Sequence, residues 1–118
     1  MTSLTSKDKM KKFELFVMIY YTLDAYYEEN VSEEINNFLS DMCPFTFADE
    51  GSADPAVYAE FCEFIKVEEI EIENSFELAC KYIEWINLPY VTTAFEWVAK
   101  EEWIVKSQRY IESLKNIK

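Results

Sequence analysis

The sequence contains no histidine, a single glycine and three prolines among its 118 residues. The absence of histidine removes the commonest general base, every Ser-His or Cys-His catalytic pair and the usual transition-metal ligand. With one glycine, a glycine-rich phosphate-binding loop is also excluded. No apolar run approaches the roughly 20 residues that a membrane-spanning helix needs. We therefore expect a protein that is neither an enzyme nor a membrane protein and that uses no cofactor.

Cysteine is scarce as well, and the spacing of the three cysteines matches no metal-binding pattern. Cys43, Cys62 and Cys80 form no CxxC pair, and their number is odd, so the sequence predicts neither a zinc site nor a disulfide framework. Cys62 and Cys80 fall on apolar helical stripes and are expected to be inert packing residues. Packing is also favoured for Cys43, but it precedes Pro44 at a helix end, so its reactivity is left open.

The N-terminal region has two features of a secretion signal, because lysines precede an apolar run from Leu15 to Leu23. However, an acidic residue, Glu14, directly precedes the run, and no small-residue cleavage site follows it. A buried amphipathic helix is the favoured interpretation. We therefore expect a cytoplasmic protein.

Positive charge is missing from the middle of the chain. The net charge is −12, and residues 13–99 hold 19 carboxylates but only Lys66 and Lys81, whereas the two ends are basic. Such a surface repels nucleic acid and anionic membranes and attracts basic proteins. The alternative is that the acidic charge only keeps an aromatic-rich protein soluble.

What is present indicates helices. Half of the residues are apolar and 17% are aromatic, which predicts a single folded domain over residues 1–118, with residues 1–6 frayed. Apolar periodicity, caps and breaks predict an all-α compact bundle of five to six helices, mostly antiparallel, with one longer ordered loop at 43–53. The expected helices are 9–29, 32–41, 55–66, 74–87, one starting near Thr93, and one from about 100 to 116.

The first of these helices is apolar on almost every side and should be central. Ser32 and Asp54 are expected N-caps, the latter followed by Pro55 at the first helical position. Asn74 with Glu77 resembles a capping box. Whether residues 67–73 form a strand, a link or more helix is left open. The first and last helices are expected to lie together and to gather the basic residues.

The stretch from Cys43 to Tyr58 holds Gly51 and two of the prolines, Pro44 and Pro55, so this loop is the natural place for function. Metal binding by its carboxylates is not expected, because their spacing does not match the EF-hand pattern. Phe45, Phe47 and Phe61 are expected to pack, as are the three tryptophans, whereas Tyr58 and Phe64 are left open. The residues predicted to bind a partner are Asp49, Glu50, Tyr58, Glu60 and Glu63.

The segment PFTFADEGSADPAVYAEF, residues 44–61, resembles a stretch found in small acidic bacterial proteins of uncharacterised function. This resemblance implies no activity. In size and charge the chain is also similar to immunity proteins that neutralise secreted nuclease toxins, whose acidic faces occupy basic active sites. The sequence thus predicts a module that binds a basic protein. The alternative is a helical protein that forms a homo-oligomer through its second apolar stripes.

Overall fold

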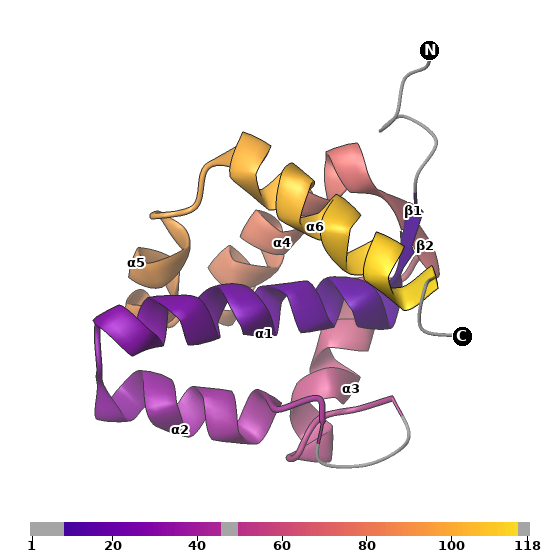
Figure 1. The fold of residues 1–118 in the computed structure, drawn as a ribbon. Coiled ribbons are helices and arrows are strands. Elements are labelled where there is room, and N and C mark those ends of the chain that lie inside the picture. Colours follow the sequence, from indigo (N-terminus) through magenta and orange to yellow (C-terminus); the bar gives the residue numbers. More distant parts are fainter. Residues whose placement is uncertain (1–8, 46–49, 116–118) are drawn as a thin grey trace.

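The computed structural model describes residues 9–45 and 50–115. Within these ranges 74% of the residues are helical, which confirms the all-α bundle, with six helices and one small two-stranded sheet (Figure 1). The elements in chain order are β1 Lys9–Lys11, α1 Lys12–Glu29, α2 Glu33–Met42, α3 Pro55–Phe64, β2 Glu69–Glu71, α4 Ile72–Ile86, α5 Pro89–Phe95 and α6 Lys100–Lys115. The expected frayed segment, residues 1–6, lies outside the described residues.

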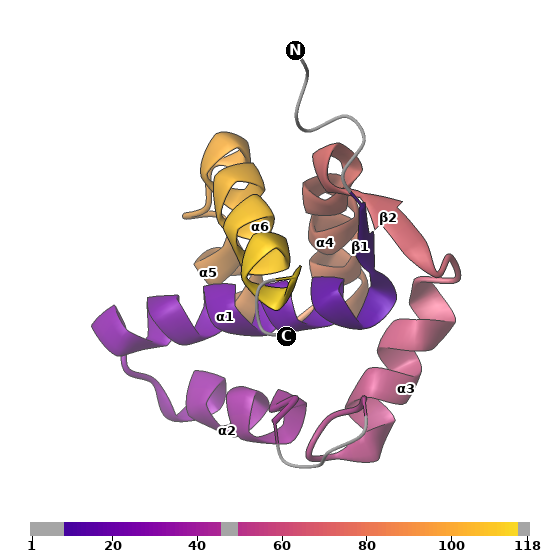
Figure 2. The same ribbon diagram turned by 45° about the vertical axis from the view of Figure 1, so that its right-hand side comes forward.

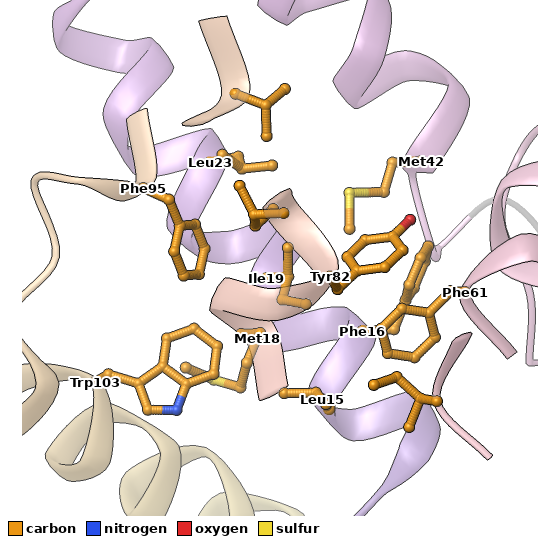
Figure 3. Close-up of a cluster of buried hydrophobic side chains, with 14 of the residues drawn as sticks. Leu15, Phe16, Met18, Ile19, Leu23, Met42, Phe61, Tyr82, Phe95 and Trp103 are labelled. Carbon is orange, nitrogen blue, oxygen red and sulfur yellow. The ribbon is translucent and has the colours of Figure 1, made fainter. Parts of the chain in front are cut away.

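Helix α1 lies at the centre of the bundle. Figures 1 and 2 both show α2 on one side of α1 and α4 and α6 on the other. Because α1 has neighbours on both sides, it buries residues on several of its faces, and it is therefore apolar nearly all round. These buried residues are Leu15, Phe16, Val17, Met18, Ile19 and Leu23. In Figure 3, Phe16 lies beside Phe61 of α3, while Met18 lies toward Trp103 of α6. The expectation of a central first helix is confirmed.

Helices α1 and α2 form an antiparallel pair joined by a short turn (Figure 1). Ser32 caps α2 as expected, since its Oγ accepts a hydrogen bond from the Ile35 amide at 3.3 Å. Ile35, Leu39 and Met42 then point inward at helical spacing. Burial of this one stripe holds α2 against α1.

Residues 67–73, which the sequence left undecided, contain a strand. β2 pairs antiparallel with β1, so that Lys9 faces Glu71, Met10 faces Ile70 and Lys11 faces Glu69. Met10 and Ile70 are buried between two pairs of opposite charge. Because cross-strand pairs of this kind stabilise a ladder, the basic N-terminal segment is drawn into the sheet, and α1 begins at Lys12 rather than Lys9.

Two predicted helix starts are wrong. The N-cap of α4 is Glu71, and Asn74 lies inside the helix, where its side chain donates a hydrogen bond to Glu71 Oε1 at 3.1 Å. The next helix starts at Pro89 rather than near Thr93. Proline fits the first helical turn, and Asn87 ends α4 in the left-handed conformation. The predicted break near Ala99 is confirmed, because α5 ends at Phe95 and α6 begins at Lys100.

The first and last helices do make contact, because α6 crosses α1 and the rings of Tyr21 and Tyr110 meet at 5.9 Å. Two of the basic residues of the end segments form ion pairs with acids of the middle segment. Lys12 pairs with Glu68 at 3.4 Å, and Lys100 pairs with Glu77 of α4 at 3.8 Å. These cations of the two end segments are therefore placed beside acids of the middle segment.

Candidate protein-binding site

The two ends of the loop between α2 and α3 are held together by the backbone. The amide of Ala53 donates to the carbonyl of Cys43, and the amide of Asp54 donates to the carbonyl of Asp41, both at 2.9 Å. The loop therefore leaves and returns at neighbouring points at the end of α2. Two residues of sequence interest, Phe47 and Asp49, lie outside the described residues.

The start of α3 is fixed by side chains of this loop. Ser52 is buried, and its Oγ accepts a hydrogen bond from the Tyr58 amide at 2.9 Å while donating to the carbonyl of Asp54. Asp54 Oδ1 accepts from the Ala56 amide at 3.1 Å, and Pro55 follows at the first helical position, so the predicted cap is confirmed. These bonds set the direction in which α3 presents its side chains.

Glu50 and Tyr58 lie on the side of α3 that faces α1. The ring of Tyr58 meets the edges of Phe13 and Phe16 at centroid distances of 5.5 and 5.0 Å. Burial raises the pKa of Tyr58, with further contributions from a hydrogen bond with Cys62 and from the charge of Glu50. Tyr58 is thus held by packing, and exposed Glu50 lies at its margin.

Glu60 and Glu63 lie elsewhere on the same helix. Both are exposed and one turn apart, and a two-residue step from Tyr58 to Glu60 turns about 200° around an α-helix. Burial raises the pKa of Tyr82 in α4, and the negative charge of Glu60 raises it further. The predicted set therefore divides into Glu50 with Tyr58 toward α1, and Glu60 with Glu63 on another side of α3, where the charge of Glu60 reaches Tyr82 of α4.

Next to Glu60 and Glu63 lies an aromatic pair from α3 and α4. Phe64 meets Trp85 at a ring distance of 5.3 Å, and 49% of the Trp85 surface is exposed. Glu84 is exposed beside Trp85. We call Glu60, Glu63, Phe64, Glu84 and Trp85 the acidic aromatic face.

The expectation that the three tryptophans pack in or near the core is wrong for Trp97, which is 75% exposed, and is met only in part by Trp85, which is 49% exposed. Trp85 contacts Phe64 and Tyr82, but it follows Lys81 at a spacing of four residues on the exposed side of α4. That charged neighbour was the available signal. Phe64, which was left open, is half-buried under Trp85.

A groove between α1 and α6 was missed entirely by the sequence reasoning. It has a volume of about 790 Å³, within the range of ligand and partner-binding pockets. Met18 and Trp103 line its inner part, and Trp97, with 75% of its surface exposed, stands at its edge. We call this feature the α1–α6 groove. Only tertiary packing of the crossing helices α1 and α6 creates it, so no local pattern could reveal it.

The cysteines are unpaired and form no metal site with neighbouring acids within residues 9–45 and 50–115. Burial, followed by the charges of Glu84 and Glu77, raises the pKa of the Cys80 thiol, which disfavours the reactive thiolate. Cys43 is half-buried and lies at the end of α2, near Tyr20. The described part of the chain also contains no helix that is long and apolar enough to cross a membrane.

Comparison of the chain with protein-family models, with curated proteins and with solved structures finds no match.

Proposed function

We propose that the protein is a non-enzymatic cytoplasmic module that docks a basic protein partner through the acidic aromatic face. The observation that carries the proposal is the half-exposed ring of Trp85, which follows exposed Glu84 and contacts Phe64 of the helix that carries exposed Glu60 and Glu63. Free thiols at all three cysteines support a reducing compartment.

Arginine is the side chain that this arrangement suits best. Its guanidinium stacks on an indole ring and donates paired hydrogen bonds to carboxylates. Trp85 offers the ring, and Phe64 supports it from beneath. Lysine would gain the charge attraction but not the planar stacking.

The surrounding charge strengthens the attraction. In the described ranges, ion pairs engage Glu68, Glu77 and Glu102, whereas Glu60, Glu63 and Glu84 have no cationic partner there. The large excess of carboxylates in residues 13–99 would steer a basic protein toward the molecule. The similarity in size and charge to immunity proteins makes a secreted nuclease toxin the partner class to test first.

Titration with two peptides of equal length and charge, one rich in arginine and one rich in lysine, tests the proposal. Glu60→Lys with Glu63→Lys should weaken binding of the arginine peptide roughly tenfold. Trp85→Ala should remove the preference for arginine over lysine. Calorimetry gives both affinities, and amide chemical shifts locate the contact.

The matched control reverses two exposed acids at helix ends away from this face, Glu28→Lys with Glu96→Lys. It changes the net charge equally but should weaken binding far less. Equal losses in the two double variants would mean that the peptides sense only the overall charge, and the proposed face would be wrong. The same variants used as baits in a lysate of the source organism distinguish a specific partner from general cation capture.

A further inference from the structure

The edge of the α1–α6 groove carries an unusual amount of exposed apolar surface. Trp97 is three-quarters exposed, and Tyr21 is exposed on the α1 side. Protruding aromatic rings beside a hollow are typical of protein interfaces, where tryptophan and tyrosine supply much of the binding energy. The groove therefore combines a projecting side chain with a space that could receive one.

The two ends of the groove carry opposite charges. One end is marked by the contact of Tyr21 with Tyr110, which follows Arg109, and the other by the contact of Tyr26 with Trp97 near Glu29. Tyr21 and Glu29 are separated by about 12 Å along α1. Within residues 9–45 and 50–115, neither Arg109 nor Glu29 has an ion-pair partner, and both are exposed.

We propose that a second copy of this chain docks on the α1–α6 groove, with Trp97 of each copy entering the groove of the other. A two-fold axis through the middle of the groove reverses its direction. The Arg109 end of one copy then faces the Glu29 end of the other, and this pairing occurs twice.

Charge favours a second copy over the basic partner at this surface. The groove is lined by two carboxylates, Glu29 and Glu102, and by two cations, Lys106 and Arg109. Two copies of a strongly acidic protein repel each other over most of their surfaces. The repulsion is weakest where the copies meet through a lining whose positive and negative charges cancel. A basic protein would find its strongest attraction elsewhere. This proposal is therefore independent of the acidic aromatic face.

Sedimentation velocity over a range of micromolar concentrations tests the proposal. The wild-type chain should show a reversible monomer–dimer equilibrium, and Trp97→Ala should weaken the dimer at least tenfold. Trp85→Ala is the matched control, because it removes an exposed tryptophan that does not line the groove. Circular dichroism checks that both variants remain folded.

Charge reversal gives a second test that does not depend on tryptophan. Arg109→Glu alone and Glu29→Arg alone should each weaken the dimer, and the double reversal should restore it. A monomer at all concentrations, equal effects of the two tryptophan variants, or no rescue in the double reversal would overturn the proposal. Added salt separates the two proposals: it should strongly weaken binding of the arginine peptide, whereas in the dimer it screens both the Arg109–Glu29 attraction and the repulsion between acidic copies and should have a smaller effect.

Discussion

The acidic aromatic face and the α1–α6 groove each contain an exposed tryptophan, but they place it in different electrostatic surroundings. Trp85 contacts α3, the helix of exposed Glu60 and Glu63, and follows exposed Glu84; within residues 9–45 and 50–115 none of these three carboxylates forms an ion pair, although Lys81 lies one turn away on α4. Trp97 stands at the edge of a hollow in which acids and bases balance. Under the two proposals, the first arrangement would select a basic partner by charge, and the second would select another copy of the chain by shape and by the pairing of Arg109 with Glu29.

The two regions also differ in what holds them in place. The groove rests on Trp103, which is 1% exposed, donates from Nε1 to Ser75 Oγ at 2.8 Å and lies 5.7 Å from both Phe76 and Phe95. The acidic side of the face depends on α3, whose start is fixed by polar loop residues. Apolar packing supports both surfaces, since Phe61 of α3 is fully buried, but the start of α3 depends in addition on a few hydrogen bonds of the loop.

The largest expected effect comes from the base of the groove. Trp103→Ala should lower the free energy of unfolding by about 3–5 kcal/mol, because it removes a fully buried ring and leaves a cavity. Trp97→Ala, at the edge of the same groove, should change it by only about 0.5 kcal/mol. Urea unfolding measures both, and similar losses would show that Trp97 is part of the folded core rather than an available surface.

The next effect tests the support of the acidic aromatic face. Ser52→Ala should cost about 1–3 kcal/mol, because the amide of Tyr58 loses its buried acceptor. Ser113→Ala, an exposed serine on α6, is the control and should be nearly neutral. If α3 is held mainly by Ser52, binding of the arginine peptide should weaken while dimerisation does not change. A loss confined to dimerisation would contradict this division.

A smaller effect is expected at the helix cap. Asp54→Ala should lower the free energy of unfolding by about 1 kcal/mol, because the Ala56 amide loses its acceptor, whereas Asp54→Asn keeps an oxygen there and should lose little. Thermal unfolding of the two variants gives the comparison. Equal destabilisation would indicate that the charge of Asp54, rather than the cap bond, stabilises α3.

The smallest effect is confined to alkaline pH. Burial raises the pKa of Tyr110 in the groove to about 12, and burial together with Glu60 raises the pKa of Tyr82 beneath the acidic aromatic face. Because an unfolded tyrosine titrates near pH 10, this stabilisation is intact below about pH 10 and is lost as the pH rises toward the folded pKa.

Urea midpoints at about pH 8 and about pH 11 should therefore fall with increasing pH. Tyr82→Phe should reduce this fall more than Tyr110→Phe, because Tyr82 is buried and Tyr110 only partly so. The opposite order would mean that the groove, not the region below the face, excludes water better.

Much of the fold follows from signals that act over a few residues. Ser32 and Asp54 were recognised as caps because each bonds an amide two or three positions away. The central place of α1 followed from its apolar residues on every side. The strand at residues 69–71 could not be fixed in the same way, because its partner, β1, is far away in the sequence.

The sequence by itself determined an acidic helical protein with a central first helix, a capped α3 and no histidine chemistry. Only the tertiary structure decided which tryptophan is buried, because Trp85, Trp97 and Trp103 all lie near apolar neighbours in sequence, and their exposure depends on which helix crosses above them. It also separated Tyr58 from Glu60 and created the α1–α6 groove. Burial and concavity arise from contacts between segments that are distant in the sequence, whereas helix caps and apolar periodicity depend on residues within a few turns of one helix.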